Sequence, residues 1–596
     1  MFQTFTVTSS PETGAPRLAK LRDVLRAKSL SGFLVPRADA HQGENVAACD
    51  ERLSWLTGFT GSAGSCAVLL DIAGVFIDGR YRLQVRKQVD LAAYTPIDWP
   101  ETSVENWLVK NLSEGSIVGY DPMLHGFDEI DKLTSALQAA GISLQQTPNL
   151  VDTIWDNRPL PPQEKIIAYP IEFAGETSES KRKKIAKILV EKELGATVLT
   201  LPDSIAWLLN IRGNDVSNTP APLCFAILKA DATLKLFVDP AKISDDVITH
   251  LGPDIQRHRP KDFGQNLREL MGKIGVDRKS APIWVSEHLQ EPVWAKDPCI
   301  LPKSRKNPTE LAGTRAAHLR DAVAMAEFLC WLDKTAPKGS LTEIDVVEKL
   351  ENFRRNTNAL TDISFETISG SGPNGAIVHY RVDENSNRQI MPNDLLLVDS
   401  GGQYLDGTTD ITRTVIIGTP TEDMARCFTL VLKGMIGISM LRWPAGRAGR
   451  DIDAFARVAL WQQGLDYDHG TGHGVGTYLG VHEGPQGISK INDIPLEPGM
   501  ILSNEPGYYR EGAWGIRIEN LVVVDAASVP VGGDREMLGF ETITWVPIDR
   551  RLIVADLLTT PERDWINDYH AEIVHKIGPL IKGETAEWLH QVCATI

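Results

Sequence analysis

The first half of the chain repeats one order of predicted elements, and this repeat limits the folds available to it. A helical pattern, an apolar strand and a Trp-containing segment follow one another at 17–28, 31–36 and 51–61, and again at 179–194, 196–202 and 203–213. Each tryptophan, Trp55 or Trp207, would by itself indicate only a helix packed on a sheet. The shared order favours two related α/β domains. In the first of them, residues 67–70 ("AVLL") and 74–81 ("GVFIDGRY") predict a hairpin with Asp-Gly turn chemistry.

A chain of 596 residues is too long for one ordinary core, and polar, proline-containing stretches mark where it divides. The first stretch, "WDNRPLPPQEK", covers 155–165, and the second, "LPKSRKNPTELAGTR", covers 301–315. A long helical pattern follows at 318–334, and a helical tail begins at about residue 550. We therefore predict two α/β domains at 1–160 and 161–305, a third domain at 306–540 and a C-terminal extension at 541–596.

Composition argues against several classes of partner. The 61 basic and 78 acidic residues leave a net charge of −17, which disfavours binding to nucleic acid or to an anionic membrane. No apolar run approaches the roughly 18 residues of a membrane span. The segment "MFQTFTVTSS" lacks the basic start and apolar core of a secretory signal. Because the seven cysteines are scattered without CxxC pairs, we expect reduced thiols and a cytoplasmic protein.

Two aspartates stand at the ends of predicted strands in "LLLVDSGGQYLDGTTDITRT", residues 395–414. The apolar run ends at Asp399, and a second strand begins after the turn-like Asp406-Gly407, so Asp399 and Asp410 can face each other on neighbouring strands. Asp399 would equally suit the cap of a strand end, and Asp410 the protein surface. Asp406 is a less suitable partner because a tight turn favours an aspartate before its glycine.

Two glutamates follow the same pattern further along the chain. "PGMILSNEPGYY" ends an apolar strand at Glu505, and "WGIRIENLVVV" puts Arg517 and Glu519 on one strand face. A glutamate just before three valines is expected to be partly buried, where an ionised carboxylate costs several kcal/mol unless a cation compensates it. Arg517 is one candidate for that cation, and a metal ion is the other.

Three of the chain's thirteen histidines fall within fourteen positions in "DHGTGHGVGTYLGVHEGP", residues 468–485, where glycines allow close backbone approach. Four carboxylates and one histidine would form an oxygen-rich site whose negative charges balance two divalent cations. Hard oxygen ligands favour Mn²⁺ or Mg²⁺, with Co²⁺ and Zn²⁺ as alternatives. In two-metal sites a bridging water becomes the nucleophile, which leaves the other histidines for proton transfer and oxyanion stabilisation.

Taken together, these motifs resemble the catalytic domain of the metallopeptidases with the pita-bread fold. The resemblance rests on Asp410 eleven residues after Asp399, on "GTGHGVG" and "NEP", and on "GIRIEN" with Glu519 fourteen residues after Glu505. "GPNGAIVHYR", "DSGGQYLDGTTDITRT" and "HGTGHGVGTYLGVHEGP" are similar to the long, three-domain Xaa-Pro aminopeptidases, and segments 39–64, 78–90, 205–216 and 564–570 extend the similarity. The implied fold is α/β and α+β multidomain, with two creatinase-like N-terminal α/β domains followed by a pita-bread catalytic domain.

The resemblance implies a metal-binding role for five residues. Asp410 and Glu519 would bridge two divalent metal ions, most readily Mn²⁺. Asp399 would complete the shell of one ion, and His473 and Glu505 the shell of the other. Glu505 would also act as the general base toward the bridging water.

The same resemblance implies supporting roles around these ligands. His379 and His482 would stabilise the tetrahedral intermediate and help to protonate the leaving proline nitrogen. His469 would contact the substrate. Arg517 and Tyr509 would hold Asp399 in place.

The implied activity is hydrolysis of the bond between an N-terminal residue and a penultimate proline, by a homodimer that acts on peptides. Proline selectivity follows from the resemblance alone. A prolidase, a methionine aminopeptidase, a creatinase-like amidinohydrolase and a non-catalytic peptide-binding relative are the alternatives, since a fold does not prove an activity. The two N-terminal domains disfavour the methionine enzyme, and the complete set of metal carboxylates disfavours the creatinase type and the binding protein.

Overall fold

The computed structural model describes residues 1–596, which form two compact units. One unit comprises Thr8–Ile300, and the other comprises Leu301–Ile596 together with Met1–Val7. The first residues join the second unit through backbone contacts: the Phe2 amide donates to the Glu351 carboxylate at 2.8 Å, and the Thr367 amide donates to the Gln3 side chain at 2.8 Å. No helix is long and apolar enough to cross a membrane.

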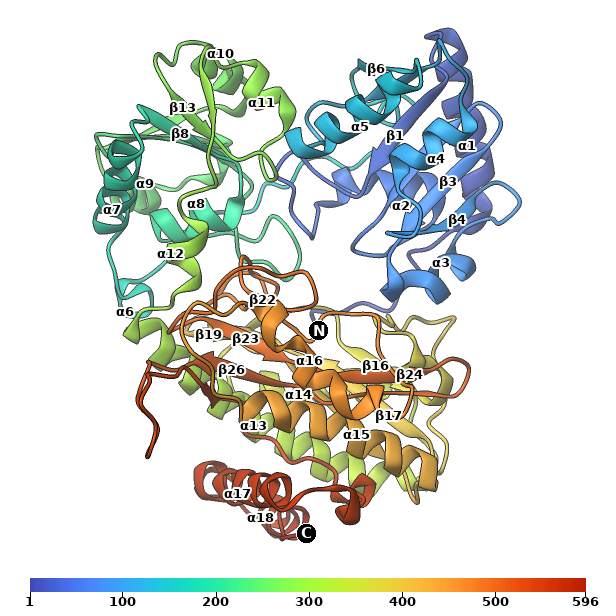
Figure 1. Ribbon diagram of the computed structural model, residues 1–596, viewed down its shortest axis with the longest axis vertical. Coiled ribbons are helices and arrows are strands. Elements are labelled where there is room, and N and C mark those ends of the chain that lie inside the picture. The colour runs from blue at the N-terminus through green and yellow to red at the C-terminus, as the bar shows by residue number, and fades with distance from the viewer. The chain divides into compact units, whose positions relative to one another are not determined.

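The unit Thr8–Ile300 contains two six-stranded sheets with the same topology (Figure 1). The strand orders are β4-β3-β2-β1-β5-β6 and β12-β11-β10-β8-β13-β14. In each sheet the first strand pairs antiparallel on one side and parallel on the other, as β1 does with β2 and β5 and β8 does with β10 and β13. The strands are β1 (Gly32–Pro36), β2 (Ser65–Leu69), β3 (Ala73–Ile77), β4 (Thr95–Asp98), β5 (Ile117–Tyr120), β6 (Ser143–Gln146), β8 (Ala196–Leu199), β10 (Phe225–Lys229), β11 (Leu234–Phe237), β12 (Ile255–His258), β13 (Ile274–Val276) and β14 (Pro292–Trp294), beside a separate pair β7 (Ile167–Ala168) and β9 (Ile211–Arg212). The predicted pair of related α/β domains is confirmed.

The helices of this unit also show the duplication, and one side-chain contact occurs in both halves. They are α1 (Pro11–Ala27), α2 (Arg52–Thr57), α3 (Arg82–Gln88), α4 (Val104–Asn111) and α5 (Phe127–Ala139) in the first half, and α6 (Ile171–Ala174), α7 (Ser178–Glu191), α8 (Pro202–Leu209), α9 (Asp245–Leu251), α10 (Phe263–Arg268) and α11 (Ile283–Glu287) in the second. Arg17 of α1 lies over the Trp55 ring at 4.5 Å, and Lys181 of α7 lies over the Trp207 ring, also at 4.5 Å. Each tryptophan therefore anchors its helix to the preceding helix by a cation–π contact, and Trp207 is buried whereas Trp55 is partly buried.

The predicted Asp-Gly hairpin turn is wrong in one respect. Strands β2 and β3 do form a hairpin, but its turn is closed by the Leu69 amide donating to the Ile72 carbonyl at 2.8 Å. Asp78 lies beyond β3, where its carboxylate accepts the Arg80 amide and caps the 3₁₀ helix η2 (Gly79–Tyr81). An aspartate before a glycine suits both a hairpin turn and a helix cap, and the parallel crossover from β3 to β4 requires the cap.

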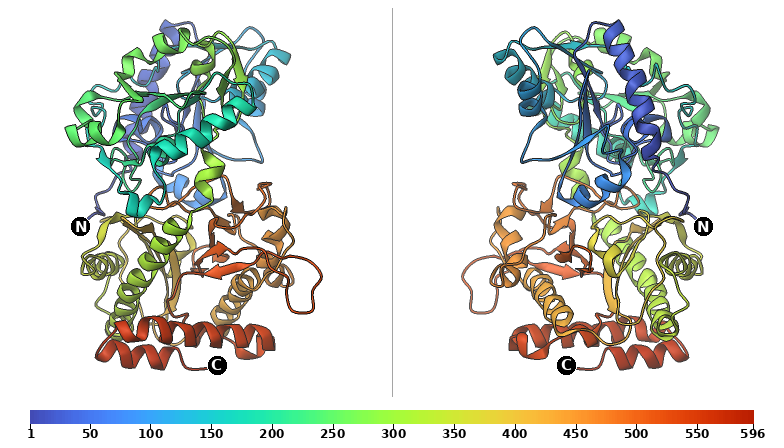
Figure 2. Two further views of the ribbon diagram at one scale, coloured as in Figure 1. Left: turned by 90° about the vertical axis from the view of Figure 1, so that its left-hand side faces the viewer. Right: turned by 90° about the vertical axis from the view of Figure 1, so that its right-hand side faces the viewer.

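The second unit sandwiches short sheets between two pairs of helices (Figure 2). Helices α13 (Pro308–Thr335) and α14 (Glu343–Arg355) cover one side of the strands, and α15 (Glu422–Ser439) and α16 (Gly449–Trp461) cover the other. The short α12 (Ile300–Ser304) precedes α13, and α17 (Thr560–Ile577) and α18 (Glu584–Val592) lie side by side at the far end. The strands are β15 (Leu360–Ile363), β16 (Ile368–Ser371), β17 (Leu395–Ser400), β18 (Gly402–Tyr404), β19 (Gly407–Thr408), β20 (Ile411–Ile416), β21 (Gly472–His473), β22 (Gly487–Ile488), β23 (Ile501–Asn504), β24 (Gly507–Arg510), β25 (Trp514–Arg517), β26 (Asn520–Val524) and β27 (Phe540–Thr542).

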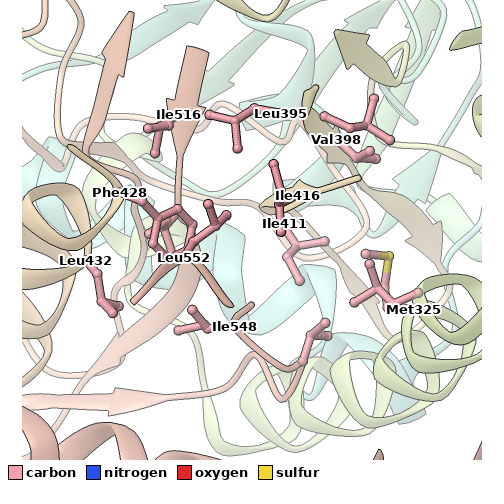
Figure 3. Close-up of a cluster of buried hydrophobic side chains, with 14 of the residues drawn as sticks. Met325, Leu395, Val398, Ile411, Ile416, Phe428, Leu432, Ile516, Ile548 and Leu552 are labelled. Atoms are coloured by element: carbon pink, nitrogen blue, oxygen red, sulfur yellow. The ribbon is translucent and has the colours of Figure 1, made fainter. Parts of the chain in front are cut away.

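The core of this unit joins helices and strands that are far apart in sequence. Figure 3 shows Met325 of α13, Leu395 of β17, Ile416 of β20, Phe428 of α15 and Ile548 converging on one cluster, and all five side chains are buried. Full burial of such a side chain stabilises the fold by roughly 1.5–3 kcal/mol. The cluster therefore fixes the strands that carry the carboxylates described below against both helix layers.

Helix α17 docks on this core through a buried histidine. The His570 Nε2 atom accepts a hydrogen bond from the Ile548 amide at 3.2 Å. Burial lowers the pKa of His570 to about 3, and the charges of Arg550 and Arg413 add to the shift. The ring is therefore a neutral acceptor in the folded protein.

We expect His570 to make the second unit labile to acid. Below its ordinary pKa of 6.5 the unfolded chain binds a proton that the folded chain does not, so stability falls as pH falls from 6.5 toward 3, by up to about 1.4 kcal/mol per pH unit. In His570→Gln an amide oxygen replaces the accepting nitrogen without titrating. Thermal unfolding from pH 8 to pH 5 should show a smaller loss of Tm for His570→Gln than for the wild type, and equal losses would contradict the assignment.

Candidate metal centre

The four carboxylates predicted as ligands lie at the ends of strands that meet in the second unit. Strands β17 and β20 pair antiparallel with Asp399 opposite Thr412, and Asp410 directly precedes β20. Strands β23 and β26 also pair antiparallel, with Glu505 directly after β23 and Glu519 directly before β26. The Glu519 amide donates to the Thr412 carbonyl at 3.2 Å, which joins the two strand pairs at that point.

His473 points at these carboxylates from the glycine-rich loop. Its Nε2 atom lies 3.4 Å from Oδ2 of Asp410 and 3.5 Å from Oε1 of Glu505. Its Nδ1 atom lies 3.0 Å from the Gly474 carbonyl, and this contact makes Nδ1 the protonated nitrogen and leaves Nε2 as the ligand. The ligand atoms of Asp410, His473 and Glu519 all lie within 4.8 Å of one another.

Two glycines of this loop are required because backbone carbonyl groups of other segments lie very close to them. A Cβ atom at position 472 would lie 1.9 Å from the Ser503 carbonyl oxygen, and one at position 474 would lie 2.0 Å from the Glu483 carbonyl oxygen. Neither contact is compatible with any other residue. Gly472 and Gly474 therefore bring the His473 backbone directly against β23.

One arginine lies among the four carboxylates. Arg517 of β25 donates from Nη2 to Oδ2 of Asp399 at 2.6 Å and from Nη1 to the Tyr509 hydroxyl at 2.6 Å. The other carboxylate oxygen of Asp399, Oδ1, is buried and has no hydrogen-bond partner. Glu519 accepts from the Thr412 hydroxyl at 2.9 Å.

Electrostatics in this cluster disfavour four ionised carboxylates without added cations. Burial raises the pKa of Glu519 well above its usual range, and repulsion from Asp410 and Asp399 adds to it. Burial also raises the pKa of Asp399 and of Glu505. Burial alone would lower the pKa of His473, but its contacts with Asp410 and Glu505 raise it to about 9.

The residues present fit a pair of divalent cations. Oδ1 of Asp399 is a buried oxygen with no hydrogen-bond donor, and the single Arg517 cannot balance four carboxylates. Carboxylate oxygens with one imidazole nitrogen form the donor set of hard or borderline divalent ions. The predicted ligands therefore form one cluster with the composition that a two-metal site needs.

The other predicted histidines surround this cluster. The His482 ring packs edge-on against the His473 ring with centroids 4.2 Å apart, and its side chain is exposed. His469 contacts the Tyr509 hydroxyl through Nε2 at 2.8 Å. His379 lies in the turn after the 3₁₀ helix η6 (Gly372–Ala376), and Arg517 donates to the carbonyl of the preceding Val378 at 3.3 Å. All three are therefore linked to residues of the carboxylate cluster.

The sequence did not reveal the residues that support the loops carrying His379 and His482. Both carboxylate oxygens of buried Glu343 accept hydrogen bonds from the η6–Tyr380 segment, including the Ser371 amide at 2.7 Å and the Tyr380 hydroxyl at 2.8 Å. The carboxylate of Glu483, next to His482, forms ion pairs with Lys303 and Lys306, and all three side chains are at most 2% exposed. No local sequence pattern marks these supports, because their partners lie far away along the chain.

The family comparisons cover nearly the whole chain. Residues 312–526 match metallopeptidase family M24, and residues 536–596 match the C-terminal region of peptidase M24. Residues 17–154 and 157–310 each match a creatinase/prolidase N-terminal domain. The chain is also 40% identical over 611 residues to a probable Xaa-Pro aminopeptidase P of Coccidioides posadasii, a match that covers 98% of this chain and 94% of the relative.

The chain belongs to metallopeptidase family M24. A second relative in this family, a probable Xaa-Pro aminopeptidase P of Laccaria bicolor, is 40% identical over 604 residues, with 97% of this chain and 93% of the relative covered. The solved structure of an X-prolyl aminopeptidase from Caenorhabditis elegans superimposes with a TM-score of 0.94 at 33% identity, over 98% of this chain and 99% of that one. That protein is described as a cytosolic enzyme with a di-nuclear active site. The expected membership of the pita-bread metallopeptidases and the expected fold class are confirmed.

We expect metal binding at this M24 site to release protons. Burial and repulsion raise the pKa of Glu519, Asp399 and Glu505, and the neighbouring carboxylates raise the pKa of His473 to about 9, so protons compete with a cation for these groups. The affinity for Mn²⁺ should therefore rise with pH, by about tenfold per pH unit for each proton released. Calorimetric titrations with Mn²⁺ at one pH, in two buffers of different ionisation enthalpy, measure the release. Identical heats in both buffers would show that the carboxylates are already ionised.

Proposed function

We propose that the chain is a metal-dependent aminopeptidase that hydrolyses the bond between an N-terminal residue and a penultimate proline. The observation that carries this proposal is the convergence of Asp399, Asp410, His473, Glu505 and Glu519 on one cluster. Members of a metallopeptidase family with such a cluster have the means to activate water. The names of the full-length relatives support the preference for proline.

In this proposal the cluster holds two divalent cations, with Mn²⁺ as the expected native metal and Co²⁺ or Zn²⁺ as alternatives. Asp410 and Glu519 would hold both ions, Asp399 would hold one, and His473 and Glu505 would hold the other. When bound, the two ions supply Lewis acidity and lower the pKa of a shared water. The described carboxylate separations support this assignment, since Asp410, His473 and Glu519 each have a ligand atom within 4.8 Å of the others.

Side chains of the protein accept and donate the protons of the reaction. Glu505 is the general base, and the hydrogen bond from the Ser503 hydroxyl to its Oε1 at 3.1 Å orients it. His482 lies at the exposed edge of the cluster, where it can reach a substrate carbonyl or leaving nitrogen. His379 is assigned the same task from the opposite loop. His469 is positioned by Tyr509 to contact the substrate.

Arg517 and Tyr509 connect these groups. The arginine donates to Asp399, to Tyr509 and to the carbonyl before His379, so one guanidinium contacts a proposed ligand, the tyrosine that binds His469 and the loop that carries His379. Its planar set of donors makes this possible, and a lysine could not replace it. We propose that both residues set ligand geometry and take no part in the chemical step.

The alternative activities differ in the substrates that they would cleave or bind. A prolidase would cleave only dipeptides, and a methionine aminopeptidase would cleave without regard to proline. A creatinase-like amidinohydrolase or a non-catalytic peptide-binding protein would not need the full ligand set that is present here. Similarity to aminopeptidase P relatives along the whole chain favours the aminopeptidase among these.

We further propose a cytoplasmic homodimer without nucleic-acid or membrane partners. All seven cysteines are free and buried, and the similar worm protein is described as cytosolic. Phe455, Val458 and Trp461 form an exposed apolar stripe on α16, as an interface between copies would require. Light scattering on the purified protein measures the oligomeric state.

Two matched tripeptides test the reaction, one with proline and one with alanine in the second position. We expect EDTA-treated protein to cleave only the proline peptide, and only after Mn²⁺ is added back, with release of the N-terminal residue as the readout. Cleavage of the alanine peptide alone would assign another aminopeptidase. A protein that binds two metal ions but cleaves only an Xaa-Pro dipeptide would be a prolidase.

His482→Ala separates catalysis from metal binding. We expect kcat to fall by about 10²–10⁴-fold while bound metal per chain stays at the wild-type value, because His482 contacts the His473 ring without belonging to the ligand set. His590→Ala, which removes an exposed histidine on α18, is the matched control. Loss of metal from His482→Ala would instead make this histidine a ligand.

A further inference from the structure

One buried arginine next to the carboxylate cluster is not among the residues of the proposed function. Arg413 of β20 is 1% exposed and donates to six neutral oxygen atoms rather than to a carboxylate. These are the carbonyl oxygens of Thr412, Glu519, Val546 and Pro547, Oδ1 of Asn520 and the hydroxyl of Tyr569, at distances from 2.6 to 3.0 Å. A buried charge that is not hydrogen-bonded to a carboxylate is costly, so these six acceptors must compensate it and thereby fix the position of the guanidinium.

Arg413 links two strands that no sheet connects. Strand β20 belongs to the sheet β16-β17-β20, and β26 belongs to the separate sheet β23-β26-β27. Asp410 directly precedes β20 and Glu519 directly precedes β26, so the proposed bridging ligands come from different sheets. Arg413 Nη1 donates to the Thr412 carbonyl at 2.9 Å and to the Glu519 carbonyl at 2.6 Å. The guanidinium therefore helps to set the separation of the two ligand-bearing strands.

The C-terminal extension holds this arginine in place. Tyr569 of α17 accepts from Arg413 Nη2 at 3.0 Å, while its own hydroxyl lies 2.9 Å from the Thr544 carbonyl oxygen. The neighbouring His570 accepts the Ile548 amide, so two consecutive residues of α17 hold the segment that supplies two of the acceptors of Arg413. Without the Tyr569 hydroxyl, Arg413 would lose an acceptor and the segment 544–548 a tie to α17.

The second C-terminal helix is packed differently. A cavity of about 190 Å³ lies beneath α18, lined by Leu332, Val415, Ile548, Trp588 and Val592 among others. Helix α17 instead reaches the ligand-bearing strands by direct hydrogen bonds. Figure 2 shows the two helices side by side, so α18 serves as an internal comparison for α17.

We infer that the C-terminal extension is part of the metal centre's framework: Tyr569 positions Arg413, and Arg413 holds the backbones of β20 and β26 at the spacing that both bridging carboxylates need. Tyr569 and Arg413 are positioning residues that touch neither substrate nor metal. This inference rests on the proposed two-metal function. It predicts that a substitution in α17 alters the affinity for metal ions although no residue of α17 contacts them.

Tyr569→Phe tests the inference by removing one hydroxyl. We expect a folded protein that binds Mn²⁺ about 10- to 100-fold more weakly than the wild type by calorimetry, with turnover restored at saturating Mn²⁺. Tyr94→Phe is the matched control, because Tyr94 is also buried and donates to a backbone carbonyl, that of Leu56, but belongs to the other unit. Unchanged Mn²⁺ affinity in Tyr569→Phe would overturn the inference, whereas a wild-type protein that binds no Mn²⁺ would overturn the proposed function itself.

Hydrogen exchange on the wild-type protein provides a second measurement that needs no variant. Coupling between binding and local opening is reciprocal, so saturating Mn²⁺ should slow amide exchange in α17 around residues 566–573. Amides of α18 should change less. Equal exchange in α17 with and without Mn²⁺ would overturn the inference even if Tyr569→Phe failed to fold.

Discussion

Mutual repulsion among three buried carboxylates and one half-buried carboxylate is the constraint on which the rest of the second unit depends. Asp399, Asp410, Glu505 and Glu519 are held together by the fold although burial and their neighbours raise the pKa of at least three of them. Folding must therefore supply a framework stiff enough to hold like charges, and cations must supply the compensation. Arg517 contributes one positive charge directly to the cluster, and the His473 ring, whose pKa is raised to about 9, contributes another.

The framework places each carboxylate where backbone is already fixed by a strand ladder. All four stand at or beside strand ends, and the ladders β17–β20 and β23–β26 restrict their movement more than loops would. Buried charged side chains outside the cluster also restrict the movement of nearby segments. The ion pair of Arg354 with Asp321, which also accepts the Tyr404 hydroxyl, fixes the region beside the Asp406 turn, and Glu483 with its two lysines fixes the loop of His482.

Much of the architecture was predictable because it rests on periodicity and repetition. Matching helix, strand and Trp segments identified two related α/β domains, and the structure gives them identical strand orders. The Asp406 turn and the long helix α13 also follow from local signals, including the Asn307–Glu310 capping box with Pro308 at the first helical position. The Asp78 turn was misplaced because Asp-Gly serves equally as a hairpin turn and as a helix cap, and only the direction of the next strand decides between them.

By itself the sequence determined which residue types stand at strand ends and at which spacing, and the family resemblance carried by these motifs implied the proposed ligands Asp399, Asp410, His473, Glu505 and Glu519. The supports of the site were decided by the tertiary structure alone. Glu343, Lys303 and Arg413 lie 37 or more residues from groups that they hold, such as Tyr380, Glu483 and Tyr569, and no local pattern marks them. A strand end is set by neighbours along the chain, whereas a hydrogen bond between distant segments exists only after packing has brought its donor and acceptor together.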